Sequence, residues 1–122
     1  HDMPEDAIAS LREAVTLEPN NNQYKKGLAI ALERTAPGSP MSNDRFAEAV
    51  GIWQDILQRT NDASGTKKDE NLSREARTHI VSLWSVTKEL PNKVAPLKAR
   101  FEADPPDLEA GRLLAEVNRK LN

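Results

Sequence analysis

The sequence predicts an all-α protein, and three observations support this prediction. Apolar residues recur at spacings of three and four through six segments, which is the period of a helix with one buried face. Alternation of apolar and polar residues, the pattern of a half-buried strand, is nowhere sustained. Hydrophobic residues make up 38% of the chain, aromatic residues 4% and charged residues 30%, a balance that suits thin helical layers.

Two N-terminal helices are predicted from their apolar stripes and from the residues that end them. Ile8, Leu11 and Val15 share one face of the first helix. Pro19 ends this helix because proline has no backbone N–H to continue it. The stripe of the second helix contains Tyr24, Leu28, Ala31 and Leu32. Gly27 inside it costs about 1 kcal/mol relative to alanine, and indicates close approach of a neighbouring helix.

The two central helices are separated by a polar segment, residues 61–71, that is expected to form a flexible loop. The third helix is expected to begin after a cap at Asn43 or Asp44. Its apolar residues are Phe46, Val50, Trp53, Ile56 and Leu57. Those of the fourth helix are Ala76, Ile80, Leu83, Trp84 and Thr87. Pro91 and Asn92 are expected to break the fourth helix.

The fifth helix is short, and its apolar face contains Val94, Leu97 and Phe101. It ends at the sequence DPPD, residues 104–107. The sixth helix carries Leu113, Leu114, Val117 and Leu121. The six expected helices cover about residues 4–18, 22–35, 44–60, 73–90, 93–103 and 108–121.

One spacing recurs between the first and third helices and indicates a repeat. The first copy is Ala7, Leu11, Ala14 and Pro19, with spacings of four, three and five residues. The second copy, with the same spacings, is Ala49, Trp53, Ile56 and Asn61. A small residue lets a neighbouring helix approach, and a large residue four positions later fills the gap. The second and sixth helices share a Leu-Ala pair instead, so two helix types alternate along the chain.

These features resemble the tetratricopeptide repeat family, whose unit is a helix pair of 34 residues. Residues 6–34, 45–62 and 104–122 carry the resemblance. It implies an α-α superhelix of about three stacked antiparallel helix hairpins, as one domain over residues 1–122. The distance from Ala7 to Ala49 is 42 residues, and the surplus over one repeat falls in residues 36–43. A helical bundle without a superhelix therefore remains an alternative.

No catalytic, metal-binding or cofactor-binding set is expected. Cysteine is absent, which removes a disulfide framework and a thiolate nucleophile without fixing the compartment. The two histidines, His1 and His79, are far apart in sequence, and His79 is interpreted as a surface or packing residue. Trp53 and Trp84 are interpreted as core residues. We expect no enzyme activity and no cofactor.

The charge and hydropathy patterns argue against two further classes of partner. The net charge is −2 and the isoelectric point about 5.7, which favours neither nucleic acid nor an anionic membrane surface. No apolar run is long enough for a membrane span, so no membrane insertion is expected. The lysine pairs at 25–26 and 67–68 are interpreted as solvated basic spots.

In the tetratricopeptide family, the first helix of each pair lines a concave groove that receives a peptide or a protein surface. By local alignment, the resemblance implies a groove lined by Gln23, Lys26, Ile30, Glu33, Thr78, Val81, Ser85, Lys88, Glu109, Arg112, Glu116 and Arg119. A clamp for a chaperone's C-terminal carboxylate is disfavoured, because Gly27 and Ile30 occupy positions where that clamp needs polar side chains. The expected function is a non-catalytic scaffold that binds a protein or peptide.

Two alternatives stay open beside the scaffold. One is a self-associating structural module, because the apolar edge of the first helix lacks a preceding helix to cover it. The other is a regulatory docking segment of a larger enzyme. The chain is interpreted as a fragment of a longer protein, and residues 1–3 as a possible remnant of expression.

Overall fold

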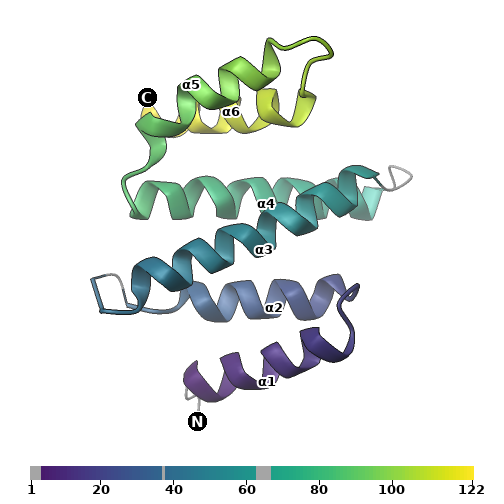
Figure 1. Cartoon of the computed structure of the whole chain (residues 1–122), viewed down its shortest axis with the longest axis vertical. Coiled ribbons are helices and arrows are strands. Elements are labelled where there is room, and N and C mark those ends of the chain that lie inside the picture. Colours follow the sequence, from purple (N-terminus) through teal and green to yellow (C-terminus); the bar gives the residue numbers. More distant parts are fainter. Residues whose placement is uncertain (1–3, 37, 63–66) are drawn as a thin grey trace. The chain divides into compact units, whose positions relative to one another are not determined.

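The structure is a computed structural model that describes residues 4–36, 38–62 and 67–122 (Figure 1). These residues form six α-helices and no strand, which confirms the prediction of an all-α protein. The helices are α1 (Pro4–Leu17), α2 (Asn22–Glu33), α3 (Ser42–Asp62), α4 (Lys67–Val86), α5 (Leu90–Phe101) and α6 (Leu108–Leu121).

The chain divides into two compact units, and the boundary between them falls inside α4. The first unit ends at Ala76, and the second is Arg77–Asn122. In the first unit α2 packs against both α1 and α3, and in the second α5 packs against α6. The connections within each of these groups join alternate ends, so consecutive helices run antiparallel (Figure 1). A single repeat domain over residues 1–122 stays a prediction.

The core of the first unit lies between α2 and α3. Leu32, Trp53 and Ile56 have exposed fractions of 0%. Ala29 and Ala49 are also fully buried, and their small side chains let the two helix axes approach. Burying one large apolar side chain of this kind contributes about 1.5–3 kcal/mol. The prediction that Trp53 and Trp84 are core residues is confirmed, since both are buried.

A buried polar contact joins the last turns of α3 to the first turns of α4. Thr60 Oγ1 lies 2.5 Å from Ser73 Oγ and 3.0 Å from the carbonyl oxygen of Leu57. Each hydroxyl has one proton, so when Thr60 donates to Leu57 it accepts from Ser73. Both hydroxyls are then satisfied although both residues are buried.

The segment predicted as a polar loop, residues 61–71, is helical at both of its ends. α3 continues to Asp62 and α4 begins at Lys67, while residues 63–66 lie outside the described residues. The prediction missed these turns because polarity was taken as a loop signal. Glu70 and Asn71 are exposed, so they form the solvent face of a helix, and Asp69 and Glu70 favour its positive N-terminal end.

α4 ends four residues before the predicted boundary at residue 90. Lys88 has a φ of 63°, and its N–H donates to the Ser85 carbonyl at 3.1 Å. The N–H of Glu89 donates to the Trp84 carbonyl at 2.8 Å. These two bonds around a left-handed residue form a Schellman motif, which ends the helix. Pro91 lies in the first turn of α5, where its missing N–H costs nothing, so it begins a helix instead of breaking one.

The boundaries of the five other helices differ from the predicted ones by at most three residues, and α6 matches its prediction. Asn21 caps α2 by accepting from the N–H groups of Gln23 and Tyr24 at 2.9 and 3.1 Å. Asp107 caps α6 in the same way through Ala110. The third helix begins at Ser42, ahead of the predicted cap.

Glycines report how closely neighbouring helices approach. A Cβ on Gly27 would lie 3.1 Å from Leu11 Cδ2, which confirms the close approach of α1 to α2 predicted at this position. A Cβ on Gly111 would lie 2.5 Å from Phe101 Cδ1, so the α5–α6 packing depends on this glycine. Gly51 on α3 is exposed, and a Cβ there would meet no atom within 4 Å.

Replacing Gly51 by alanine should raise the free energy of unfolding by about 1 kcal/mol, because alanine loses less backbone entropy in a helix. Urea denaturation followed by circular dichroism measures the change. Gly111→Ala is the matched control, and it should lack this gain because the Phe101 ring must move. Equal stabilisation in both variants would contradict the packing described at Gly111.

Candidate functional site

Four of the residues predicted to line a groove share one side of α2. Their spacings of three, four and three residues keep them on one helix face. They are Gln23, Lys26, Ile30 and Glu33. Gln23 is exposed and the other three are half-buried, so this face is partly open to solvent.

Two of these four side chains hold α2 against other helices of the first unit. Lys26 Nζ lies 2.8 Å from Glu75 Oε1 on α4. Trp53 Nε1 on α3 donates to Glu33 Oε2 at 2.6 Å. A partner on this face would therefore meet Gln23, Ile30 and a lysine whose charge is already paired.

The four residues predicted around α4 do not form one surface. Thr78 is exposed and Ser85 half-buried on α4. Val81 is 3% exposed, so its side chain is part of the packing and not of a groove. Val81 directly follows the buried Ile80. Burial of its apolar side chain is favourable in free energy, so the side chain packs inside although the repeat alignment places it in the groove. Lys88 lies beyond the end of α4, in the turn described above.

The four residues predicted on α6 form a row of charges. Arg77 of α4 makes two parallel hydrogen bonds to Glu109, at 2.7 and 3.0 Å, and both side chains are only 16% exposed. Arg112 Nη1 lies 3.6 Å from Glu109 Oε1. Arg119 Nη1 lies 2.8 Å from Glu116 Oε1. Arg112 and Arg119 remain exposed despite these contacts along their own helix.

Ion pairs join helices that are two apart in the chain, and sequence reasoning missed them. Four such pairs are Glu5–Arg45 and Arg12–Glu48 between α1 and α3, Lys26–Glu75 between α2 and α4, and Arg77–Glu109 between α4 and α6. Their partners are 32 to 49 residues apart in sequence. No helical spacing reaches that far, so no local pattern could have indicated the pairing.

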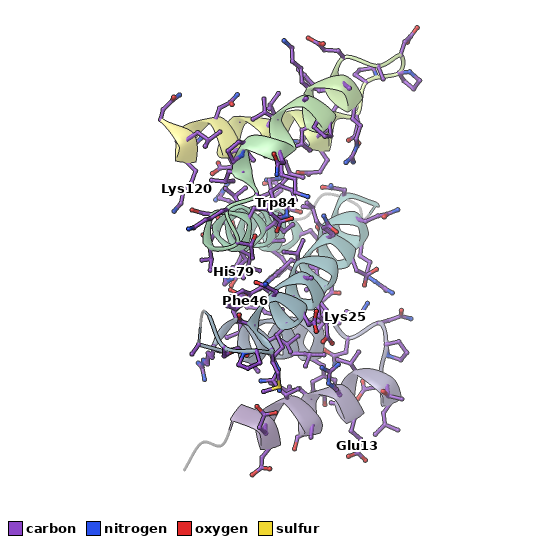
Figure 2. All side chains as sticks on the ribbon, turned by 60° about the vertical axis from the view of Figure 1, so that its left-hand side comes forward. Glu13, Lys25, Phe46, His79, Trp84 and Lys120 are labelled. Carbon is purple, nitrogen blue, oxygen red and sulfur yellow. The ribbon has the colours of Figure 1, made fainter. Side chains whose placement is uncertain are left out.

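The interpretation of residues 25 and 26 as a solvated basic spot is wrong. The Lys25 side chain is 10% exposed, and its ammonium donates to Asp55 of α3 (Figure 2). Asp55 also accepts from Arg59 Nε at 3.0 Å. A buried ammonium needs such a partner because leaving water is costly for a charge. The side chains of the second lysine pair, at 67–68, lie outside the described part of the structure.

The carboxyl groups with shifted pKa values all belong to ion pairs or caps. Burial raises the pKa of Asp55, but hydrogen bonds from Lys25 and Arg59 outweigh it and leave the pKa below its ordinary value. The Ala110 N–H, and then Arg100, lower the pKa of Asp107. The Arg45 hydrogen bond lowers the pKa of Glu5. These shifts stabilise charged carboxylates, whereas general acid–base catalysis needs a pKa near the working pH.

The described residues contain neither a metal site nor a membrane-spanning helix. No group of three or more His, Asp or Glu side chains within them is placed to hold a metal ion. His79 is half-buried on α4 and interacts within the chain (Figure 2). None of the described helices is long and apolar enough to cross a membrane. Comparisons of the chain with protein-family models, curated proteins and solved structures found no match.

Replacing Asp55 by alanine should cost about 1–3 kcal/mol of stability, because it leaves the buried Lys25 ammonium without its partner. Lys25→Met should cost less, since Asp55 is half exposed and keeps Arg59. Urea unfolding midpoints of both single variants and of the double variant measure the asymmetry. A double variant no more stable than Asp55→Ala would argue against this account.

The pH dependence of stability should change in Asp107→Asn. The folded-state pKa of Asp107 lies below its ordinary value of 3.8, so its stabilisation is complete above that value. It is lost as the pH falls through the folded-state pKa. The stability difference between wild type and Asp107→Asn should therefore shrink in strong acid, as measured by thermal unfolding across that range. A difference independent of pH would contradict the prediction.

Proposed function

We propose that the chain is a tetratricopeptide-like helical repeat module that binds a protein or peptide without catalysis. The observation that supports this proposal most is the set of ion pairs between helices two apart in the chain. In the first unit they connect α1 to α3 and α2 to α4, and in the second they connect α4 to α6.

These ion pairs favour stacked hairpins over an up-and-down four-helix bundle. In such a bundle, the first and third helices are diagonal across the apolar core, as are the second and fourth. Charged side chains do not meet across a core, because burying them there is costly. In a stack of hairpins, helices two apart are neighbours, so their exposed charges can pair. Ion pairs between the first and third helices and between the second and fourth helices both occur in the first unit.

The repeated spacing of α1 and α3 fits the same proposal. Ala49 is fully buried, whereas the equivalent Ala7 is exposed. The difference has a simple cause: α3 packs against α2 and also has side-chain contacts with α1 and α4, whereas α1 packs against α2 and makes ion pairs with α3. A helix of the repeat buries both sides only when it has neighbours on both.

The proposed binding surface in the first unit is the solvent side of α2, around Gln23 and Ile30. Ile30 supplies an apolar contact, and Gln23 supplies a hydrogen-bond donor and acceptor. The Lys26–Glu75 pair beside them presents both signs of charge. This mixture suits a peptide or protein surface of mixed polarity more than a highly charged one. A docking segment of a larger enzyme would use the same surface.

Affinity capture tests the proposal with the variant Gln23→Glu/Ile30→Glu. The captured partner should bind this variant about tenfold more weakly or worse, because both changes fall at the centre of the proposed contact. Gln54→Glu/Gln58→Glu on the exposed side of α3 is the control, since it adds the same charge. Circular dichroism checks that both variants are folded. A partner that binds both variants equally would count against the α2 surface.

A further inference from the structure

α1 has an exposed stripe on the side away from α2. Its residues are Asp6, Ser10, Glu13 and Leu17, spaced by four, three and four. All four are exposed, and Leu17 is 74% exposed. Figure 2 shows Glu13 pointing away from the other helices of the first unit. Within the described part of the chain, neither acidic residue of this stripe makes an ion pair.

α6 has an exposed stripe with the same spacings. Its residues are Leu108, Arg112, Ala115 and Arg119. All four are exposed, and Leu108 is 59% exposed. The opposite side of α6 buries Ala110, Leu113 and Val117. The stripe is therefore the solvent side of this helix, on which two arginines flank an alanine.

The two stripes match each other when the helices run antiparallel. α1 and α6 each have 14 residues, so they overlap along their whole length. When Leu17 is placed opposite Leu108, every remaining residue of the α1 stripe lies opposite a residue of the α6 stripe that matches it in charge or size. The facing pairs are Leu17–Leu108, Glu13–Arg112, Ser10–Ala115 and Asp6–Arg119. Opposite charges face each other twice, two small residues meet in the middle, and two leucines meet at one end.

The parallel orientation does not match. It would place Asp6 opposite Leu108 and Leu17 opposite Arg119, and neither arginine would face an acidic residue. Helix dipoles also favour the antiparallel orientation. The stripes therefore specify both a direction and a register.

From this complementarity we infer that α1 of one copy packs antiparallel on α6 of a second copy, so that copies of the chain associate head to tail. This interface goes beyond the proposed partner-binding surface on α2 and does not depend on it. It takes Arg112 and Arg119 out of any groove, because the second copy covers them. A head-to-tail contact uses two different surfaces, so it can continue into longer assemblies.

The contact is small, which sets its expected strength. A helix of this length spans about 21 Å, and one helix pair falls at the small end of specific interfaces. Arg112 and Arg119 must share or leave their contacts with Glu109 and Glu116, and such exposed pairs within a helix are worth only about 0.2–0.5 kcal/mol. The association is therefore weak, and salt weakens it further because its ion pairs lie near solvent.

Sedimentation velocity of the full chain over a wide concentration range, at low and high salt, measures this association. Wild type forms dimers and larger species at high concentration and low salt. Asp6→Arg/Glu13→Arg and Arg112→Glu/Arg119→Glu each stay monomeric, because facing charges then repel. A mixture of the two variants associates again, since the reversed α1 matches the reversed α6 and the unchanged helices also match.

Arg34→Glu/Lys98→Glu is the control for charge alone. Both residues are exposed, Arg34 at the end of α2 and Lys98 on α5. This control associates like wild type. A wild type that is monomeric at every concentration would overturn the inference. So would association that survives either reversal, or a mixture of folded variants that fails to associate.

Disulfide trapping checks the register. The chain has no cysteine, so introduced thiols report only on this contact. Ser10→Cys and Ala115→Cys, mixed and mildly oxidised, should give mainly the mixed disulfide, because these positions face each other in the proposed register. A statistical proportion of mixed and like-with-like disulfides, measured by mass spectrometry, would overturn the register.

Discussion

Each helix of this chain must find neighbours, because a helix of 12 to 21 residues with a narrow apolar stripe is marginal in water alone. α2 shows the consequence most clearly. It packs against α1 on one side and α3 on the other, and it buries Leu28, Ala29, Ala31 and Leu32 in doing so. α1, which packs against α2 and meets α3 through ion pairs, leaves Ala7 and Leu17 exposed. The number of neighbours therefore decides how much of each stripe is buried.

Because the layers are thin, many charged side chains lie close enough to other helices to pair with them. Exposed ion pairs contribute little free energy, typically about 0–1 kcal/mol. Their importance here is geometric, since each pair joins particular helices in a particular register. The Arg77–Glu109 pair differs from the others, because both side chains are sheltered and the two hydrogen bonds are parallel. Lys25 and Asp55 show the same use of charge at the edge of the α2–α3 core.

The candidate site was only partly predictable. Helical spacing places Gln23, Lys26, Ile30 and Glu33 on one side of α2 whatever the fold, and the structure agrees. The same alignment failed at Val81, where an apolar side chain is buried, and at Lys88, where a Schellman turn ends the helix first. The failure at Val81 comes from taking the repeat pattern as a guide to exposure, whereas Lys88 is exposed but lies beyond the end of the helix. Exposure depends on the neighbours that each helix acquires, and a pattern within one helix contains no information about them.

The sequence by itself determined the all-helical fold class, the approximate extent of six helices and the burial of Trp53 and Trp84. These features depend on interactions between residues three or four positions apart, which a single sequence displays directly. Only the tertiary structure decided that Lys25 is buried against Asp55, that Lys26 pairs with Glu75 and that Pro91 begins a helix. The ion-pair partners come from different helices, and the place of Pro91 depends on hydrogen bonds that end α4 before it. Contacts between distant segments form only when helices pack, so their partners are chosen by geometry that no local pattern contains.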